Sequence, residues 1–175
     1  MMIAITGTPG TGKTRLAEEL RARGYEVLDI NEQVRNNGLL EEKDEGRDTY
    51  CVDTDALDLL LEGHRGKELV LIEGHISHCV ECDMIIVIRC SPDILAKRLK
   101  ERGYSQNKVT ENVQAEILDV ILCEASEADV PVWELNSSSY AATALADMAE
   151  DIIKGNTDKY RPGNVDWTEE IEKWF

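Results

Sequence analysis

The sequence predicts an α/β fold in which a mainly parallel sheet of five strands lies between two layers of helices. Short apolar runs, typical of strands covered on both faces, alternate along the chain with segments of helical periodicity. A glycine-rich turn follows the first apolar run, where it would connect a strand to a helix. A length of 175 residues suits one domain with a single core.

The first half of the chain carries a local signal for each expected element. Apolar runs bounded by turn residues indicate strands, and Asp53 has the short polar side chain that caps helix N-termini. Residues 31–52 are polar and turn-prone. The expected elements are a strand over 1–6, a helix over 13–23, a strand over 25–30 and a helix from about 54 to 61.

The second half continues the alternation. Ser91 and Pro92 suit the N-cap and first position of a helix that would end at Gly103. The expected elements are strands over 68–73, 84–90 and 130–135, and helices over 92–103, 110–128 and 138–154. In such a sheet, ligands bind at the carboxyl ends of the strands.

A tail over residues 155–175 differs in composition from the domain that precedes it. Glycine and proline interrupt its first part, and Trp167, Ile171 and Trp174 then recur at helical spacing. We expect a short amphipathic helix that packs on its own domain, with docking of a partner as the alternative.

Charge and composition exclude several classes of protein. A net charge of −16 repels nucleic acid, so strong direct nucleic-acid binding is not expected. The five cysteines are an odd number without a secreted context, which favours reduced thiols. No apolar run reaches the roughly 18 residues that a bilayer requires, so we expect a cytoplasmic protein without a membrane partner.

Residues 7–14, with the sequence GTPGTGKT, fit the phosphate-binding pattern G-x-x-x-x-G-K-S/T at every fixed position. Glycines at Gly10 and Gly12 let the backbone fold so that its N–H groups face the terminal phosphates of a nucleotide. Lys13 would lie across those phosphates, and the hydroxyl of Thr14 would bind Mg²⁺. The pattern therefore predicts a site for a nucleoside triphosphate with Mg²⁺.

The P-loop alone does not distinguish a kinase from an ATPase or a GTPase. GTPases read guanine with an N-K-x-D motif, but here the nearest match is NKVT at 107–110, which lacks the carboxylate. No D-x-x-G motif is present either. The sequence therefore disfavours a GTPase.

Glu73 ends an apolar strand that should lie near the P-loop, so its carboxylate can hold a Mg²⁺-bound water or orient a nucleophile. His75 follows directly after the intervening glycine. With His78, Cys79 and Cys82 it forms the pattern H-x-x-H-C-x-x-C. Structural zinc sites usually draw ligands from two separated pairs, so ordinary loop residues are the favoured interpretation and metal binding stays open.

Three cations lie near Gly103 in an otherwise acidic chain: Arg98, Arg102 and Lys108. Arg98 and Arg102 are four residues apart and share one helical face. A mobile lid that closes over phosphates needs such cations, because the transferred phosphoryl group spreads negative charge over its oxygens. The alternative is a solvated basic surface.

Taken together, these residues resemble the P-loop nucleoside monophosphate kinases, and among them the adenylate kinase isoenzyme 6 family in its archaeal form. The resemblance runs to about Lys154. It is carried by IAITGTPGTGKT at 3–14, EGH at 73–75, RLKERGY at 98–104 and TENVQAEI at 110–117.

The resemblance implies a kinase domain over 1–154, with a monophosphate-binding insert at about 28–51 and a lid at about 101–111. It differs at Glu73, where the family often has Asp, and it gives no pattern for the tail. The residues implied to bind ATP are Gly10, Gly12, Lys13, Thr14, Arg15 and Arg102. The residues implied to be catalytic are Lys13, Glu73, His75 and Arg102. The residues suggested to hold the acceptor are Asn31, Glu32, Arg35, Asp53 and Asp55.

The resemblance also implies an activity and a partner. What the resemblance implies is a broad-specificity adenylate kinase that also hydrolyses ATP. It further implies that the protein binds a basic small-subunit ribosomal protein and assists late rRNA maturation. We expect ATP, AMP and Mg²⁺ as ligands. The alternative is an ATP-driven ribosome-assembly factor whose main activity is hydrolysis.

Overall fold

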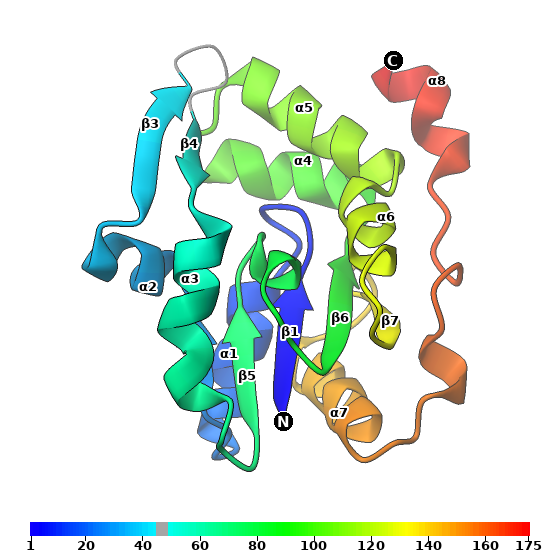
Figure 1. The fold of residues 1–175 in the computed structure, drawn as a ribbon. Coiled ribbons are helices and arrows are strands. Elements are labelled where there is room, and N and C mark those ends of the chain that lie inside the picture. The colour runs from blue at the N-terminus through cyan, green and yellow to red at the C-terminus, as the bar shows by residue number, and fades with distance from the viewer. Residues whose placement is uncertain (45–48) are drawn as a thin grey trace.

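The computed structural model describes residues 1–44 and 49–175. Five strands form one parallel sheet in the order β2-β5-β1-β6-β7, which confirms the predicted fold class (Figure 1). The carboxyl ends of all five strands lie along one edge of the sheet, where the glycine-rich turn leaves β1. The strands are β1 (Met2–Thr6), β2 (Val27–Asp29), β5 (Val70–Glu73), β6 (Met84–Arg89) and β7 (Val132–Asn136).

Helices cover both faces of the sheet. Because alternate residues of a strand point to opposite faces, Ile3 and Ile5 of β1 pack into one core and Met2 and Ala4 into another. The helices of the first face are α1 (Lys13–Ala22) and α7 (Ala142–Ile153); those of the second are α2 (Ile30–Asn37), α3 (Thr54–Leu61) and α6 (Val120–Ser126).

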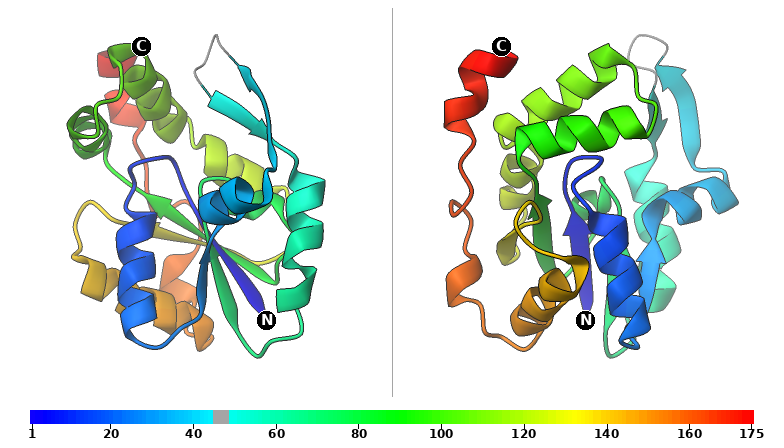
Figure 2. Two further views of the ribbon diagram at one scale, coloured as in Figure 1. Left: turned by 90° about the vertical axis from the view of Figure 1, so that its left-hand side faces the viewer. Right: turned by 180° about the vertical axis from the view of Figure 1, so that it is seen from behind.

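Two further helices, α4 (Pro92–Glu101) and α5 (Gln106–Ile117), lie across the carboxyl edge of the sheet above the glycine-rich turn (Figure 1). The C-terminal tail runs outside the sheet and brings α8 (Ile171–Trp174) beside α5 (Figure 2). Trp167 and Trp174 pack against the apolar residues shared by α4 and α5. The tail therefore packs on its own domain.

Between α2 and α3 in the sequence, β3 (Leu40–Asp44) and β4 (Thr49–Val52) pair as a separate two-stranded antiparallel sheet that projects away from the main sheet (Figure 2). The segment expected as an insert at 28–51 contains the end of β2, α2 and most of this pair of strands, and its residues 45–48 lie outside the described part of the chain. The expectation of a polar, turn-prone segment missed α2. That helix begins because the Asp29 carboxylate accepts hydrogen bonds from the backbone N–H of Asn31 (2.8 Å) and Glu32 (3.2 Å).

The prediction of one helix over 110–128 is wrong. The chain forms α5 and α6, separated at Asp119, which has a φ of 56°. The Asp119 carboxylate pairs with Arg89 on β6, and this contact accompanies the turn between the two helices. Elsewhere the observed element ends differ from the expected ones by a few residues.

None of the helices among the described residues is both long enough and apolar enough to span a bilayer.

Candidate active site

The glycine-rich turn between β1 and α1 forms a tight cradle. Gly7 has a φ of 140°, and a Cβ atom there would lie 2.3 Å from the Ile88 carbonyl oxygen, so this position requires glycine. Behind the loop, the Arg98 guanidinium donates to the carbonyl oxygens of Gly10 (3.3 Å) and Thr11 (3.2 Å). Hydrogen bonds from Arg98, which does not line the pocket, therefore hold these two carbonyl groups of the loop.

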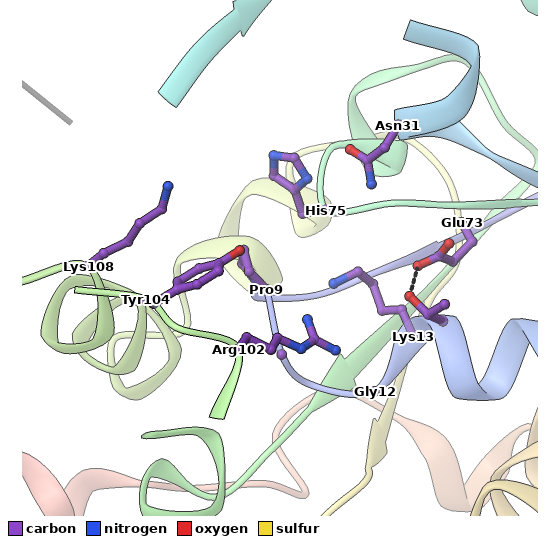
Figure 3. Close-up of a pocket in the computed structure, with 11 residues that line it drawn as sticks. Pro9, Gly12, Lys13, Asn31, Glu73, His75, Arg102, Tyr104 and Lys108 are labelled. Atoms are coloured by element: carbon purple, nitrogen blue, oxygen red, sulfur yellow. Dashed lines mark hydrogen bonds between the residues drawn. The ribbon is translucent and has the colours of Figure 1, made fainter. Parts of the chain in front are cut away.

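A pocket of about 320 Å³ opens beside this loop, and its side chains come from both flanks of the carboxyl edge (Figure 3). Lys13, Glu73, His75 and Arg102, which the sequence nominated as catalytic, all line it. The lining residues are Pro9, Gly10, Gly12, Lys13, Thr14, Asn31, Glu73, His75, Arg102, Tyr104 and Lys108.

The Lys13 side chain is buried at the floor of this pocket, with 7% of its surface exposed. Its Nζ donates to the carbonyl oxygens of Gly7 (2.6 Å) and Thr8 (3.1 Å). Burial lowers the pKa of Lys13 to about 8, although the nearby Glu73 carboxylate opposes the shift. The ammonium is thus mostly charged at neutral pH but can titrate in the mildly alkaline range.

Glu73 reaches the loop because β5 pairs with β1 in a register that sets Glu73 opposite Ile5. The Thr14 hydroxyl donates to Glu73 Oε1 at 3.1 Å. Burial raises the pKa of Glu73, and the charge of Lys13 partly opposes that rise. A carboxylate beside a hydroxyl is an all-oxygen set of the kind that Mg²⁺ prefers, so these two side chains fit the metal.

Gly74 separates Glu73 from His75 and packs closely against α2. A Cβ atom at Gly74 would lie 2.8 Å from the Cβ of Ile30, the first residue of α2. The lack of a side chain therefore lets α2 approach β5 and brings Asn31 to the pocket.

The His75 ring faces the pocket from the loop after β5 (Figure 3). Burial, followed by the charge of Lys13, lowers the pKa of His75 to about 4, so the imidazole is neutral at neutral pH. Within the described residues, this ring has no hydrogen-bond partner in the protein. A neutral imidazole of this kind can accept a hydrogen bond from water or orient it.

The other members of the H-x-x-H-C-x-x-C pattern point elsewhere. His78 contacts the Thr6 hydroxyl through Nδ1 (2.8 Å) and Glu124 through Nε2 (3.1 Å), whereas Cys79 is exposed and Cys82 packs against the core. Among the residues that the structure describes, no three His, Cys, Asp or Glu side chains are grouped to hold a metal ion.

The three cations near Gly103 divide into two sets. Arg102 and Lys108 line the pocket, and Lys108 Nζ lies 5.1 Å from the centre of the Tyr104 ring. Arg98 instead supports the loop from behind through the carbonyl contacts described above. Two of these cations therefore belong to the pocket, and the third belongs to the support of the loop.

The remaining nominated residues are placed differently. Arg15 is exposed on α1 and does not line the pocket. Of the suggested acceptor residues, Asn31 lines the pocket, whereas Asp53 caps α3 by accepting from the Ala56 N–H at 2.9 Å. Glu32, Arg35 and Asp55 do not line it. Tyr104 also lines the pocket and was not predicted as a site residue, although its place directly after the glycine of the expected lid was a usable signal.

Known proteins resemble the chain along its whole length. A family profile described as the AAA domain matches residues 3–119. A protein of Methanocaldococcus jannaschii named "Putative adenylate kinase" is 44% identical, over 100% of this chain and 96% of that protein. A protein of Archaeoglobus fulgidus with the same name is 39% identical, over 98% of this chain and 94% of that one.

Solved structures share the fold at low sequence identity. Shikimate kinase from Acinetobacter baumannii superposes with a TM-score of 0.60 at 20% identity, covering 89% of this chain and 93% of that one. Deoxyadenosine kinase from M. mycoides superposes with a TM-score of 0.55 at 14% identity, covering 89% and 100%. At these identities the likeness shows the fold alone.

Proposed function

The chain belongs to the archaeal adenylate kinase family, and from this premise we propose that it transfers the γ-phosphoryl group of ATP to AMP and other nucleoside monophosphates. The observation that carries the proposal is that Lys13 of the P-loop, Arg102 from the expected lid and Asn31 from the expected insert line the same pocket. The kinase domain would extend over 1–154, with the insert at about 28–51 and the lid at about 101–111.

The residues of the pocket suit an in-line transfer without a covalent intermediate. The loop amides and the Lys13 ammonium would hold the β- and γ-phosphates, and Arg102 would stabilise the charge that develops on the transferred group. Gly10, Gly12, Thr14 and, by family resemblance, Arg15 would complete the ATP site. Because the protein donates no nucleophile, its contribution is orientation and charge stabilisation.

Magnesium is the ion that the Thr14 and Glu73 oxygens fit, and we propose these residues as its holders. When bound, the ion would neutralise negative charge between the β- and γ-phosphates. Glu73 replaces the shorter acid common in the family, yet its hydrogen bond to Thr14 keeps both oxygen donors on the same side of Lys13. Glu32, Arg35, Asp53 and Asp55 stay proposals for the acceptor side.

A second activity, hydrolysis of ATP, is favoured by the neutral His75 ring at the pocket. With water as acceptor, His75 or Glu73 would orient the nucleophile. In that role the protein would act as a cytoplasmic assembly factor on a basic small-subunit ribosomal protein during rRNA maturation. The net charge of −16 suits a basic partner of this kind.

A coupled assay tests both activities. Purified protein, ATP and Mg²⁺ are combined with each monophosphate in turn, with and without the ribosomal protein, and ADP formation is followed. We expect the fastest turnover with AMP and a loss of about 10³-fold in Arg102→Ala. Turnover that is indifferent to every monophosphate but stimulated by the ribosomal protein would favour the hydrolytic role, and normal turnover in Arg102→Ala would refute the site.

A further inference from the structure

A second group of charged side chains lies beside the P-loop but outside the pocket. We call Arg89, Glu116, Asp119 and Glu134 the Arg89 cluster. Arg89, Glu116 and Glu134 are each at most 4% exposed. Arg89 Nε donates to Glu116 Oε1 at 2.8 Å, Nη1 donates to Glu134 Oε1 at 2.7 Å, and the guanidinium also pairs with Asp119. Burying so many charges is costly unless each finds partners.

Within this cluster, Glu116 of α5 connects three other parts of the molecule. Its Oε2 accepts from the Thr8 hydroxyl of the P-loop at 2.6 Å. Its Oε1 accepts from the Cys90 N–H at 3.1 Å and from the Trp167 indole N–H at 3.4 Å, in addition to Arg89. One carboxylate thereby joins the loop, the end of β6 and the C-terminal tail to α5.

Thr8 is held through its carbonyl oxygen and through its hydroxyl. Its carbonyl oxygen accepts from Lys13 Nζ (3.1 Å) and from the Thr11 hydroxyl (2.9 Å), while its own hydroxyl donates to Glu116. A phosphate that binds Lys13 competes for the ammonium protons that Lys13 donates to the loop carbonyls. The bond to Glu116 involves no group that faces the pocket, so it is compatible with a bound nucleotide. Bonds to a carboxylate are also stronger than those between neutral groups.

We propose that Glu116 is a positioning residue, which holds Thr8 and thereby keeps the P-loop in place when the Lys13 ammonium turns from the loop carbonyls to the phosphates. The expected effect on turnover rests on the proposed phosphoryl transfer, whereas the expected effect on the position of the P-loop does not. Helix α5, which lies above the P-loop (Figure 1), also carries Lys108 and follows Tyr104, and both of these residues line the pocket. The bond between Thr8 and Glu116 therefore connects the loop to the helix on the lid side of the pocket.

Two matched pairs of proteins isolate the Thr8 hydroxyl. Thr8→Val replaces the hydroxyl of the unaltered protein with a methyl group, and Thr8→Ala differs from Thr8→Ser only by that hydroxyl. Hydrogen exchange of the amides in residues 7–16 is measured with and without MgATP, together with the ATP dissociation constant and the turnover with AMP. The Ala and Ser pair decides the question if the Val variant fails to fold.

We expect the proteins without the hydroxyl to exchange these amides about tenfold faster than their partners. Turnover should fall about 10²-fold, the effect of misplacing a reacting group by about 1 Å, while ATP affinity changes far less. Equal exchange and turnover within both pairs would overturn the proposal, as would losses of turnover and affinity in equal measure. If the unaltered protein binds MgATP but phosphorylates no monophosphate, the proposed function fails, and the exchange data still decide the role of Glu116.

Discussion

The pocket side chains and the Arg89 cluster both lie beside the P-loop, but they differ in how many hydrogen-bond and ion-pair partners the protein gives them. Glu73 has the Thr14 hydroxyl as a side-chain donor, and among the described residues the His75 ring has none. Glu134, by contrast, binds Arg89 through one oxygen and accepts three backbone N–H groups of the tail through the other. Polar side chains that still have unused hydrogen-bonding capacity can bind a ligand, whereas charged side chains whose hydrogen bonds are all made stabilise the fold.

The pKa values of the basic groups follow the same division. Burial and the neighbouring Lys13 charge together lower the pKa of His75 to about 4, and burial lowers the pKa of Lys13 to about 8 against the opposing carboxylates of Glu73 and Glu116. Burial alone would also lower the pKa of Arg89, but the carboxylates of Glu116, Asp119 and Glu134 raise it above the ordinary value. Substitutions in the two groups should therefore affect different measurements.

Replacing Lys13 should have the largest effect on activity. Lys13→Met keeps the apolar stem but removes the charge, so turnover with AMP should fall by more than about 10³-fold. The free energy of unfolding should not fall, because a buried ammonium is costly to desolvate. Steady-state kinetics and urea denaturation measure the two quantities. A large loss of stability with little loss of turnover would contradict the prediction, because Lys13 would then stabilise the fold as the Arg89 cluster is expected to do.

Replacing Glu134 should lower the free energy of unfolding and leave turnover almost unchanged. Glu134→Leu leaves three tail N–H groups and one side of Arg89 without their acceptor, and should lower the free energy of unfolding by about 3 kcal/mol. Turnover of the folded protein should stay close to normal, because the bond between Thr8 and Glu116 persists. Glu134→Gln is the control, since its amide oxygen can still accept from the tail and it should lose less. Unchanged denaturation of the Leu variant would contradict the prediction.

Replacing His75 tests the hydrolytic role. His75→Gly should slow ATP hydrolysis about 10²-fold, the lower end of the contribution of general acid–base groups, because the low pKa makes the ring a weak base. The ATP dissociation constant should change much less, since no phosphate-binding charge is removed. Hydrolysis rates and calorimetry on the same preparation provide the comparison. Losses of equal size in both would show that His75 acts only in binding.

The smallest effect should appear in the pH dependence of ATP binding. Only the charged form of Lys13 attracts phosphate, so affinity should be constant below pH 8 and fall about tenfold for each pH unit above it. Lys13→Arg is the matched variant, because its guanidinium stays charged and should remove the dependence. Titration calorimetry between pH 7 and about 10 measures this. An alkaline decline that persists in the Arg variant would assign it to another group.

The features predicted from the sequence are those whose determinants are close together in the chain. The P-loop is a run of consecutive residues, and Glu73 was placed by the strand that it ends. The Arg89 cluster could not be foreseen, because Arg89 lies within an apolar strand and its carboxylate partners come from three later segments. The turn at Asp119 accompanies the same long-range contact. Helix α2 was missed because residues 31–37 are mostly polar and its cap, Asp29, lay within an expected strand.

The closeness of Gly74 to Ile30 has a consequence for substrate choice. Since even a methyl group at Gly74 would push against the first residue of α2, the position of α2, which carries the pocket residue Asn31, depends on a missing side chain. Gly74 acts as a spacer between β5 and α2. If the Asn31 side of the pocket binds the acceptor as proposed, a larger residue at Gly74 would change which acceptors fit.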